Sequence, residues 1–157
     1  MFRRFLSALA AALVSVAVPA ADEPDISGES GIAIESAWVR ALPPTVKNTA
    51  AYLAVTNNSE SAQAVVAARS DVAAKVEIHT TVHQDGMVRM QQLPGVALAQ
   101  GETVAFAPGG THLMLLGLAY PLVPGDEVEL CLVFATGSEA CTTAQVRRDE
   151  GGGHQHH

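Results

Sequence analysis

Apolar residues recur at every second position along much of this chain, and this pattern constrains its fold more than any other feature. The segments 32–38, 51–55 and 76–82 alternate in this way, which is typical of strands that bury one face and expose the other. Clusters of Gly, Pro and Asn separate these segments, and no sustained helical stripe interrupts them. The pattern therefore predicts an all-β chain folded as an antiparallel β-sandwich or barrel.

The composition excludes several classes of function. The chain has 157 residues, 48% of them hydrophobic, which is enough for a packed core and typical of a single domain. Its formal net charge of −7 argues against any partner held through phosphate contacts, so we expect no nucleic-acid binding. The 2 cysteines are too few for a disulfide scaffold or a four-thiolate zinc site.

Residues 1–20 have the order of charges and apolar residues typical of a secretory signal peptide. Arg3 and Arg4 precede an apolar run that extends to Val18, and small residues follow. We expect cleavage after Ala20. The ordinary secretion route is favoured over the twin-arginine route, because no residue separates the arginine pair from the Phe-Leu that follows it.

The rest of the chain divides into three parts by composition. Residues 21–31 predict a flexible lead-in, residues 32–146 a folded β domain, and residues 147–157 a flexible tail without periodicity. No later apolar run reaches the roughly 18 residues that a membrane span needs. We therefore expect a protein that works outside the cytoplasm, with no membrane insertion after signal cleavage.

The dipeptide Asp85-Gly86 is a strong signal for a two-residue β-hairpin, because both residues tolerate the positive φ of a type I′ turn. With this turn, Thr81 faces Met90 and His79 faces Gln92. His79 and Met90 then lie on one face as diagonal neighbours, with Cβ atoms about 7 Å apart. A metal ion with bonds of roughly 2.0–2.3 Å can bridge such a gap between extended side chains.

A second pair of candidate ligands follows the glycine-rich segment 108–110. His112 and Met114 are two residues apart, so a strand places both on one face and Leu113 on the other. Two imidazoles and two thioethers form a soft-to-borderline donor set, and thioether sulfur selects Cu(I) over zinc, calcium or magnesium. A blue-copper electron-transfer centre needs a cysteine ligand, and no cysteine lies near these positions in the sequence.

The spacing of these four residues resembles the signature of the periplasmic copper chaperones called PCu(A)C. The arrangement is His79-x10-Met90-x21-His112-x-Met114, and the likeness covers about residues 32–146. The resemblance implies a cupredoxin-like antiparallel β-sandwich, or Greek-key barrel, with an exposed Cu(I) site. Carried over by position, these four residues are the expected Cu(I) ligands.

The resemblance also implies a function and partners. It implies a non-enzymatic carrier that delivers Cu(I) to a cuproprotein, namely the Cu(A) centre of cytochrome c oxidase subunit II, alongside Sco-type thiol proteins. We expect a monomer. The main alternative is a periplasmic protein that sequesters copper for tolerance, without a dedicated recipient. A redox enzyme is disfavoured by the lack of a cysteine ligand, and a structural adhesion domain predicts no metal binding.

The tail carries three further histidines, His154, His156 and His157. Histidine-rich tracts bind borderline metals, and imidazole suits Cu(II). We therefore expect these three residues to form a Cu(II) site, with an expression remnant as the alternative reading.

Five other residues have a simpler expected role. Cys131 and Cys141 flank an apparent hairpin, so they can form a cross-strand disulfide, which an oxidising compartment favours over two free buried thiols. His83 is favoured as an exposed residue at a strand end rather than an auxiliary ligand. Met87 is expected to pack, and Trp38 to be a core aromatic.

Overall fold

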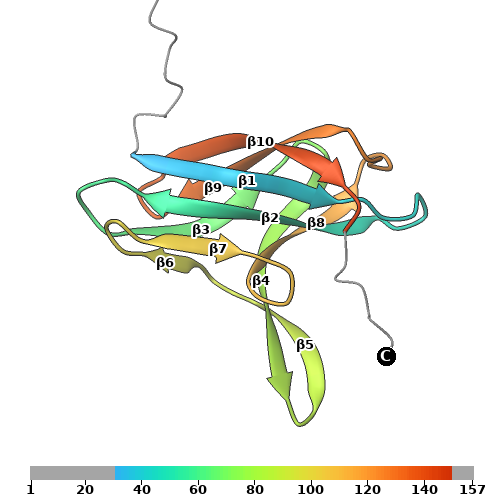
Figure 1. Ribbon diagram of the computed structural model, residues 1–157, viewed down its shortest axis with the longest axis horizontal. Coiled ribbons are helices and arrows are strands. Elements are labelled where there is room, and N and C mark those ends of the chain that lie inside the picture. The colour runs from blue at the N-terminus through green and yellow to red at the C-terminus, as the bar shows by residue number, and fades with distance from the viewer. Residues whose placement is uncertain (1–30, 150–157) are drawn as a thin grey trace, which may run out of the picture.

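The computed structural model describes residues 31–149, and all its regular elements within this range are strands (Figure 1). This confirms the all-β prediction, and the three predicted strands lie within β1, β2 and β4. No helix in this range is long and apolar enough to cross a membrane. The elements are β1 (Ile32–Arg40), β2 (Asn48–Asn57), β3 (Gln63–Arg69), β4 (Ala73–Gln84), β5 (Met87–Gln92), β6 (Val96–Leu98), β7 (Thr103–Phe106), β8 (His112–Leu118), β9 (Glu127–Phe134) and β10 (Glu139–Arg147).

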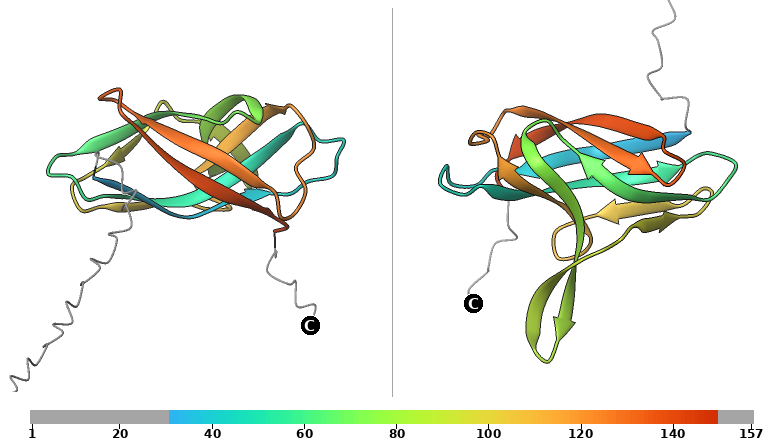
Figure 2. Two further views of the ribbon diagram at one scale, coloured as in Figure 1. Left: turned by 90° about the horizontal axis from the view of Figure 1, so that it is seen from above. Right: turned by 180° about the vertical axis from the view of Figure 1, so that it is seen from behind.

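Seven of these strands close into a barrel, which Figure 2 shows from two further sides. The order around the barrel is β4-β8-β2-β1-β10-β9-β3, and β3 pairs with β4 to complete the ring. The three remaining strands pair with strands of this ring: β5 with β4, β6 with β3, and β7 with β2. All pairings are antiparallel except that of β1 with β10, which is parallel. The antiparallel prediction therefore fails at this one pair, because residue alternation does not show how the first and last strands meet.

The core consists of the side chains that point from each strand into the barrel. Leu113 and Leu115 of β8 are fully buried, as are Phe106 of β7 and Phe134 of β9. Leu113 points inward between His112 and Met114, as the sequence predicts. The neighbouring outward positions of β4 and β8 are therefore left free for polar side chains.

The β4–β5 hairpin has the predicted turn and register. Asp85 and Gly86 both have positive φ, of 52° and 73°. Thr81 pairs with Met90, and His79 pairs with Gln92. Figure 1 shows the hairpin projecting away from the barrel, and every residue of β5 is exposed. Met90 is consequently presented to solvent on the same hairpin face as His79.

Trp38 is not a core residue, so that prediction is wrong. The pairing of β1 with β2 shifts between Glu35 and Trp38, and Ser36 within this irregularity has a φ of 53°. This bulge reverses the alternation, so Val39 takes the inward position and is fully buried. Trp38 lies on the outer face instead, with its ring centroid 4.5 Å from that of Tyr52.

The ends of the folded domain differ slightly from the prediction. Arg147, assigned to the flexible tail from the sequence, is the last residue of β10, and its guanidinium lies 4.3 Å from the centre of the Trp38 ring. Asp149 forms an ion pair of 2.6 Å with Arg40. The predicted signal peptide and the three tail histidines lie outside the described residues.

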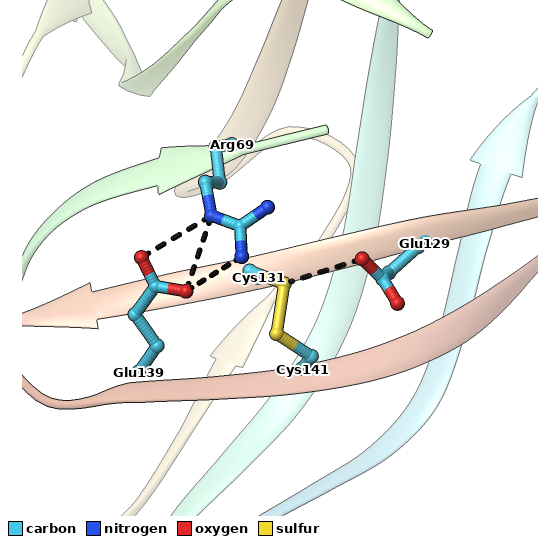
Figure 3. A network of polar contacts seen from close by, with 5 residues as sticks. All are labelled: Arg69, Glu129, Cys131, Glu139 and Cys141. Atoms are coloured by element: carbon cyan, nitrogen blue, oxygen red, sulfur yellow. Dashed lines mark hydrogen bonds and ion pairs between the residues drawn. A yellow bond between two sulfur atoms is a disulfide. The ribbon is translucent and has the colours of Figure 1, made fainter. Parts of the chain in front are cut away.

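The expected disulfide joins Cys131 of β9 to Cys141 of β10, which lie directly opposite each other (Figure 3).

His83 is exposed, as favoured from the sequence. Met87 is 49% exposed, so the expectation that it packs is wrong. It lies near the tip of a hairpin that extends beyond the core.

Replacing Leu113 by Ala should lower the free energy of unfolding by about 2–5 kcal/mol, because it opens a cavity in a fully buried position. Met90→Ala is the matched control, and we expect it to change stability by less than about 0.5 kcal/mol because Met90 is exposed. Equilibrium denaturation in urea measures both. Equal losses for the two variants would contradict the assigned faces of β8 and β5.

Candidate metal centre

The two candidate histidines face each other across neighbouring strands. His79 of β4 is the direct partner of His112 of β8 in the ladder, and their ring centroids are 6.0 Å apart. Met114 lies two residues beyond His112, and its partners are Glu77 on β4 and Ala50 on β2. The sequence predicts each His–Met pair separately, and the pairing of β4 with β8 brings both pairs to one place on the outer face of the barrel.

His112 is buried, with 3% of its surface exposed. Its Nδ1 lies 2.9 Å from the carbonyl oxygen of Gly110. Because a carbonyl can only accept a hydrogen bond, Nδ1–H is the donor, and in the neutral ring Nε2 carries a lone pair. This Nε2 is buried and has no hydrogen-bond partner among the described residues.

His79 has the complementary arrangement. Its Nε2–H donates a hydrogen bond of 2.7 Å to the carboxylate of Glu77, which leaves the lone pair on Nδ1. This Nδ1 is also buried without a partner among the described residues. The pKa of Glu77 lies below its ordinary value because its carboxylate accepts hydrogen bonds, first from the Lys75 ammonium and then from His79. Glu77 is therefore ionised and holds the His79 ring by a charge-assisted contact.

Two buried lone pairs without partners, on rings that face each other, fit a metal ion. Most buried polar atoms are hydrogen-bonded, so exceptions call for a physical reason. A metal bonded at about 2.0–2.1 Å to one nitrogen of each ring lies roughly 3 Å from each ring centroid, and the observed 6.0 Å between the centroids allows this. Glu77 accepts a hydrogen bond from the other nitrogen of His79, and the Gly110 carbonyl accepts one from the other nitrogen of His112. Hydrogen bonds of this kind fix the tautomer and orientation of metal-binding histidines.

Both candidate methionines lie at the same place. Met90, Met114 and His112 line one cavity of about 220 Å³, together with Thr81. Met114 is half-buried, whereas Met90 is 63% exposed. The structure therefore gathers all four predicted residues at the base of the projecting hairpin, and His79 joins the group through its position opposite His112.

Several residues around the centre are absent from the sequence prediction. Glu77 precedes His79 by two residues, so strand alternation could have placed it on the same face. Tyr52 lies with its ring centroid 6.3 Å from that of His112, and burial raises the pKa of its hydroxyl, which the charge of Arg40 partly offsets. Tyr52 could not be assigned without the pairing of β2 with β8, whereas the contact of Gly110 with His112 is local and depends on the ring orientation.

Comparison with known proteins agrees with this fold. A family model described as "Putative lipoprotein LpqE-like" matches residues 32–146. The chain belongs to the LpqE-like family. A curated relative, "Putative lipoprotein Lxx21020" of Leifsonia xyli subsp. xyli, is 33% identical over 134 residues, which cover 85% of this chain and 80% of the relative.

Solved structures confirm the resemblance of this LpqE-like chain to PCu(A)C proteins. The solution structure of CuI-DR1885 from Deinococcus radiodurans is 31% identical with a TM-score of 0.60, over 79% of this chain and 85% of that one. The copper-bound PCuAC domain from PmoF2 is 24% identical with a TM-score of 0.62, over 75% of this chain and 93% of that one. The cupredoxin-like β fold expected from the resemblance is thereby confirmed.

The hydrogen bonds of the two rings predict their tautomers in the metal-free protein. When both rings are neutral, we expect His112 to carry its proton on Nδ1 and His79 on Nε2, because the partners of these atoms are acceptors. Two-dimensional NMR that correlates ring nitrogens with ring protons distinguishes the tautomers. The opposite tautomer at either ring would contradict the assignment of the free lone pair.

Proposed function

We propose that this protein is an extracytoplasmic copper chaperone that binds Cu(I) through His79, Met90, His112 and Met114. The observation that carries the proposal is a facing pair of histidines, each with a buried ring nitrogen that has no partner among the described residues, next to a cavity that His112 lines together with both thioethers. The similarity to DR1885, whose solved form is described as CuI-DR1885, supports the choice of metal.

The donor set favours Cu(I) over other biological metals. Thioether sulfur is a soft ligand, and imidazole binds borderline and soft ions. All four proposed ligands are neutral, and no thiolate takes part because Cys131 and Cys141 are joined to each other. Uncharged ligands hold a monovalent ion without the strong attraction of a thiolate, which suits a protein that must release its cargo.

The proposed ligands differ in exposure, and this suggests the order in which they release copper. His112 is 3% exposed, and the side chain of His79 is 17% exposed. Met90, on the projecting hairpin, is 63% exposed. A ligand of the recipient can therefore replace Met90 first, while the two histidines still hold the ion. Transfer then proceeds by stepwise ligand exchange and needs no catalytic group.

The proposed recipient is the Cu(A) centre of cytochrome c oxidase subunit II, with a Sco-type thiol protein as a further partner. The PCu(A)C resemblance supports this choice, and the lipoprotein descriptions of the family and of its relative support a location outside the cytoplasm. Periplasmic location, signal cleavage after Ala20 and a monomeric state belong to the same proposal. Copper sequestration for tolerance would use the same four ligands.

A deletion strain separates delivery from sequestration. If the protein delivers copper, loss of the gene should reduce Cu(A) loading and oxidase activity at limiting copper, and added copper should restore both. Growth at high copper should change little. Normal oxidase activity together with greater copper sensitivity would contradict delivery and support sequestration.

Cu(I) binding should depend on Met90 and not on Met87. Both methionines are exposed residues of β5, but Met90 shares a face with His79 and Met87 lies on the opposite face. We expect Met90→Ala to weaken Cu(I) binding by about tenfold or more, in the range reported for perturbed metal sites. Anaerobic competition titration with a chromophoric Cu(I) chelator measures the affinity. Met87→Ala is the control, and equal effects of the two variants would contradict the proposed site.

The tail histidines should bind Cu(II) independently of the Cu(I) ligands. Deletion of residues 151–157 removes His154, His156 and His157, so it should abolish Cu(II) binding and leave Cu(I) affinity unchanged. Titration of both oxidation states against the full-length protein tests this. Cu(II) binding that is unchanged by the deletion would contradict a role for the tail.

A further inference from the structure

A second group of potential ligand atoms lies on the outer face of β9 and β10, separate from the proposed copper centre. The ligand atoms of Glu129, Cys131 and Cys141 all lie within 4.8 Å of one another. Figure 3 shows Glu129 beside the disulfide, with its Oε1 3.8 Å from Sγ of Cys131. In the order of the barrel, β2 and β1 separate β10 from β8, and β3 separates β9 from β4.

This disulfide is open to a reductant. Cys131 is buried, whereas Cys141 is exposed. Cys141 and Glu129 line a groove of about 570 Å³ together with residues 32–35 of β1. The groove exists because β1 pairs with β10 only from Trp38 to Arg40, so the earlier part of β1 is not hydrogen-bonded to β10. A thiol can approach the Cys141 sulfur along this groove.

The folded sheet would hold the two cysteines together after reduction. They are direct partners in a ladder of seven residue pairs between β9 and β10. Arg69 on the neighbouring strand β3 also pairs with Cys131, and its side chain forms an ion pair of 2.7 Å with Glu139. These contacts do not depend on the bond between the sulfurs, so the two thiols and Glu129 stay adjacent.

We propose that reduction of the Cys131–Cys141 disulfide creates a Zn(II) site formed by both thiolates and the carboxylate of Glu129. Two sulfurs and one carboxylate oxygen are a donor set that zinc accepts, and the exposed position leaves a fourth place for water. A carboxylate next to two thiolates is unfavourable without a cation and favourable with one. The site is therefore closed in the oxidised protein and available in the reduced one.

The reductant is a dithiol, such as the reduced form of a thiol–disulfide oxidoreductase. One of its thiolates bonds to Sγ of Cys141, and the bond to Cys131 breaks with the Cys131 sulfur leaving as a thiolate. The second thiol of the reductant then displaces Cys141 and closes the reductant's own disulfide. The protein gains two electrons and two protons, the dithiol loses them, and Zn(II) then replaces the two thiol protons.

Zinc titration of the oxidised and the reduced protein tests this proposal. The purified protein is reduced with a phosphine, freed of it under argon, and titrated with Zn(II) against a chromophoric chelator. We expect the reduced protein to bind one more Zn(II) per chain than the oxidised protein. Co(II) in place of zinc should give sulfur-to-metal charge-transfer absorption only after reduction.

Two variants test the ligands, and two others serve as controls. Cys131→Ser with Cys141→Ser should remove the additional binding, and Glu129→Gln, which keeps both cysteines, should weaken it by about tenfold or more. Glu127→Gln is the matched control, since Glu127 is an exposed residue on the same strand and face. His112→Ala should leave the additional zinc unchanged, so the result does not depend on the proposed copper site.

Equal zinc binding before and after reduction would overturn the proposal. Additional binding that survives the double serine substitution would also overturn it. Unchanged zinc affinity in Glu129→Gln would overturn the three-ligand site.

Discussion

The proposed metal centre depends on the direct pairing of His79 with His112 across strands β4 and β8. This pairing turns two histidines that are distant in the sequence into adjacent rings on the outer face of a closed barrel. Glu77 and the Gly110 carbonyl then accept a hydrogen bond from one nitrogen of each ring. The other nitrogen of each ring keeps its lone pair and has no protein partner among the described residues.

The surrounding fold supplies rigidity on one side of the centre and access on the other. Leu113 and Ile78 pack into the core directly behind the histidine pair, so the two rings are fixed by the barrel itself. Met90 belongs to a hairpin that leaves the barrel and is exposed along its whole last strand. A centre with two anchored ligands and one exposed ligand can hold an ion firmly and still allow a recipient to approach it.

Local rules predicted the parts of this structure that depend on neighbours in the sequence. The Asp85-Gly86 turn fixed the register of the hairpin, and the alternation around Leu113 placed His112 and Met114 on one face. The same rules failed at Trp38, because a β-bulge reversed the alternation. They also could not show that β4 pairs with β8 or that β1 lies parallel to β10, since these contacts join distant parts of the chain.

X-ray absorption spectroscopy of the Cu(I)-loaded protein is the most direct test of the proposed centre. We expect a Cu(I) edge with both nitrogen and sulfur neighbours, from two imidazoles and two thioethers. In the Met90→Ala, Met114→Ala double variant, the sulfur contribution should disappear and the imidazole contribution should remain. A wild-type spectrum without sulfur, or one unchanged by the loss of both methionines, would contradict the proposed set of two histidine and two methionine ligands.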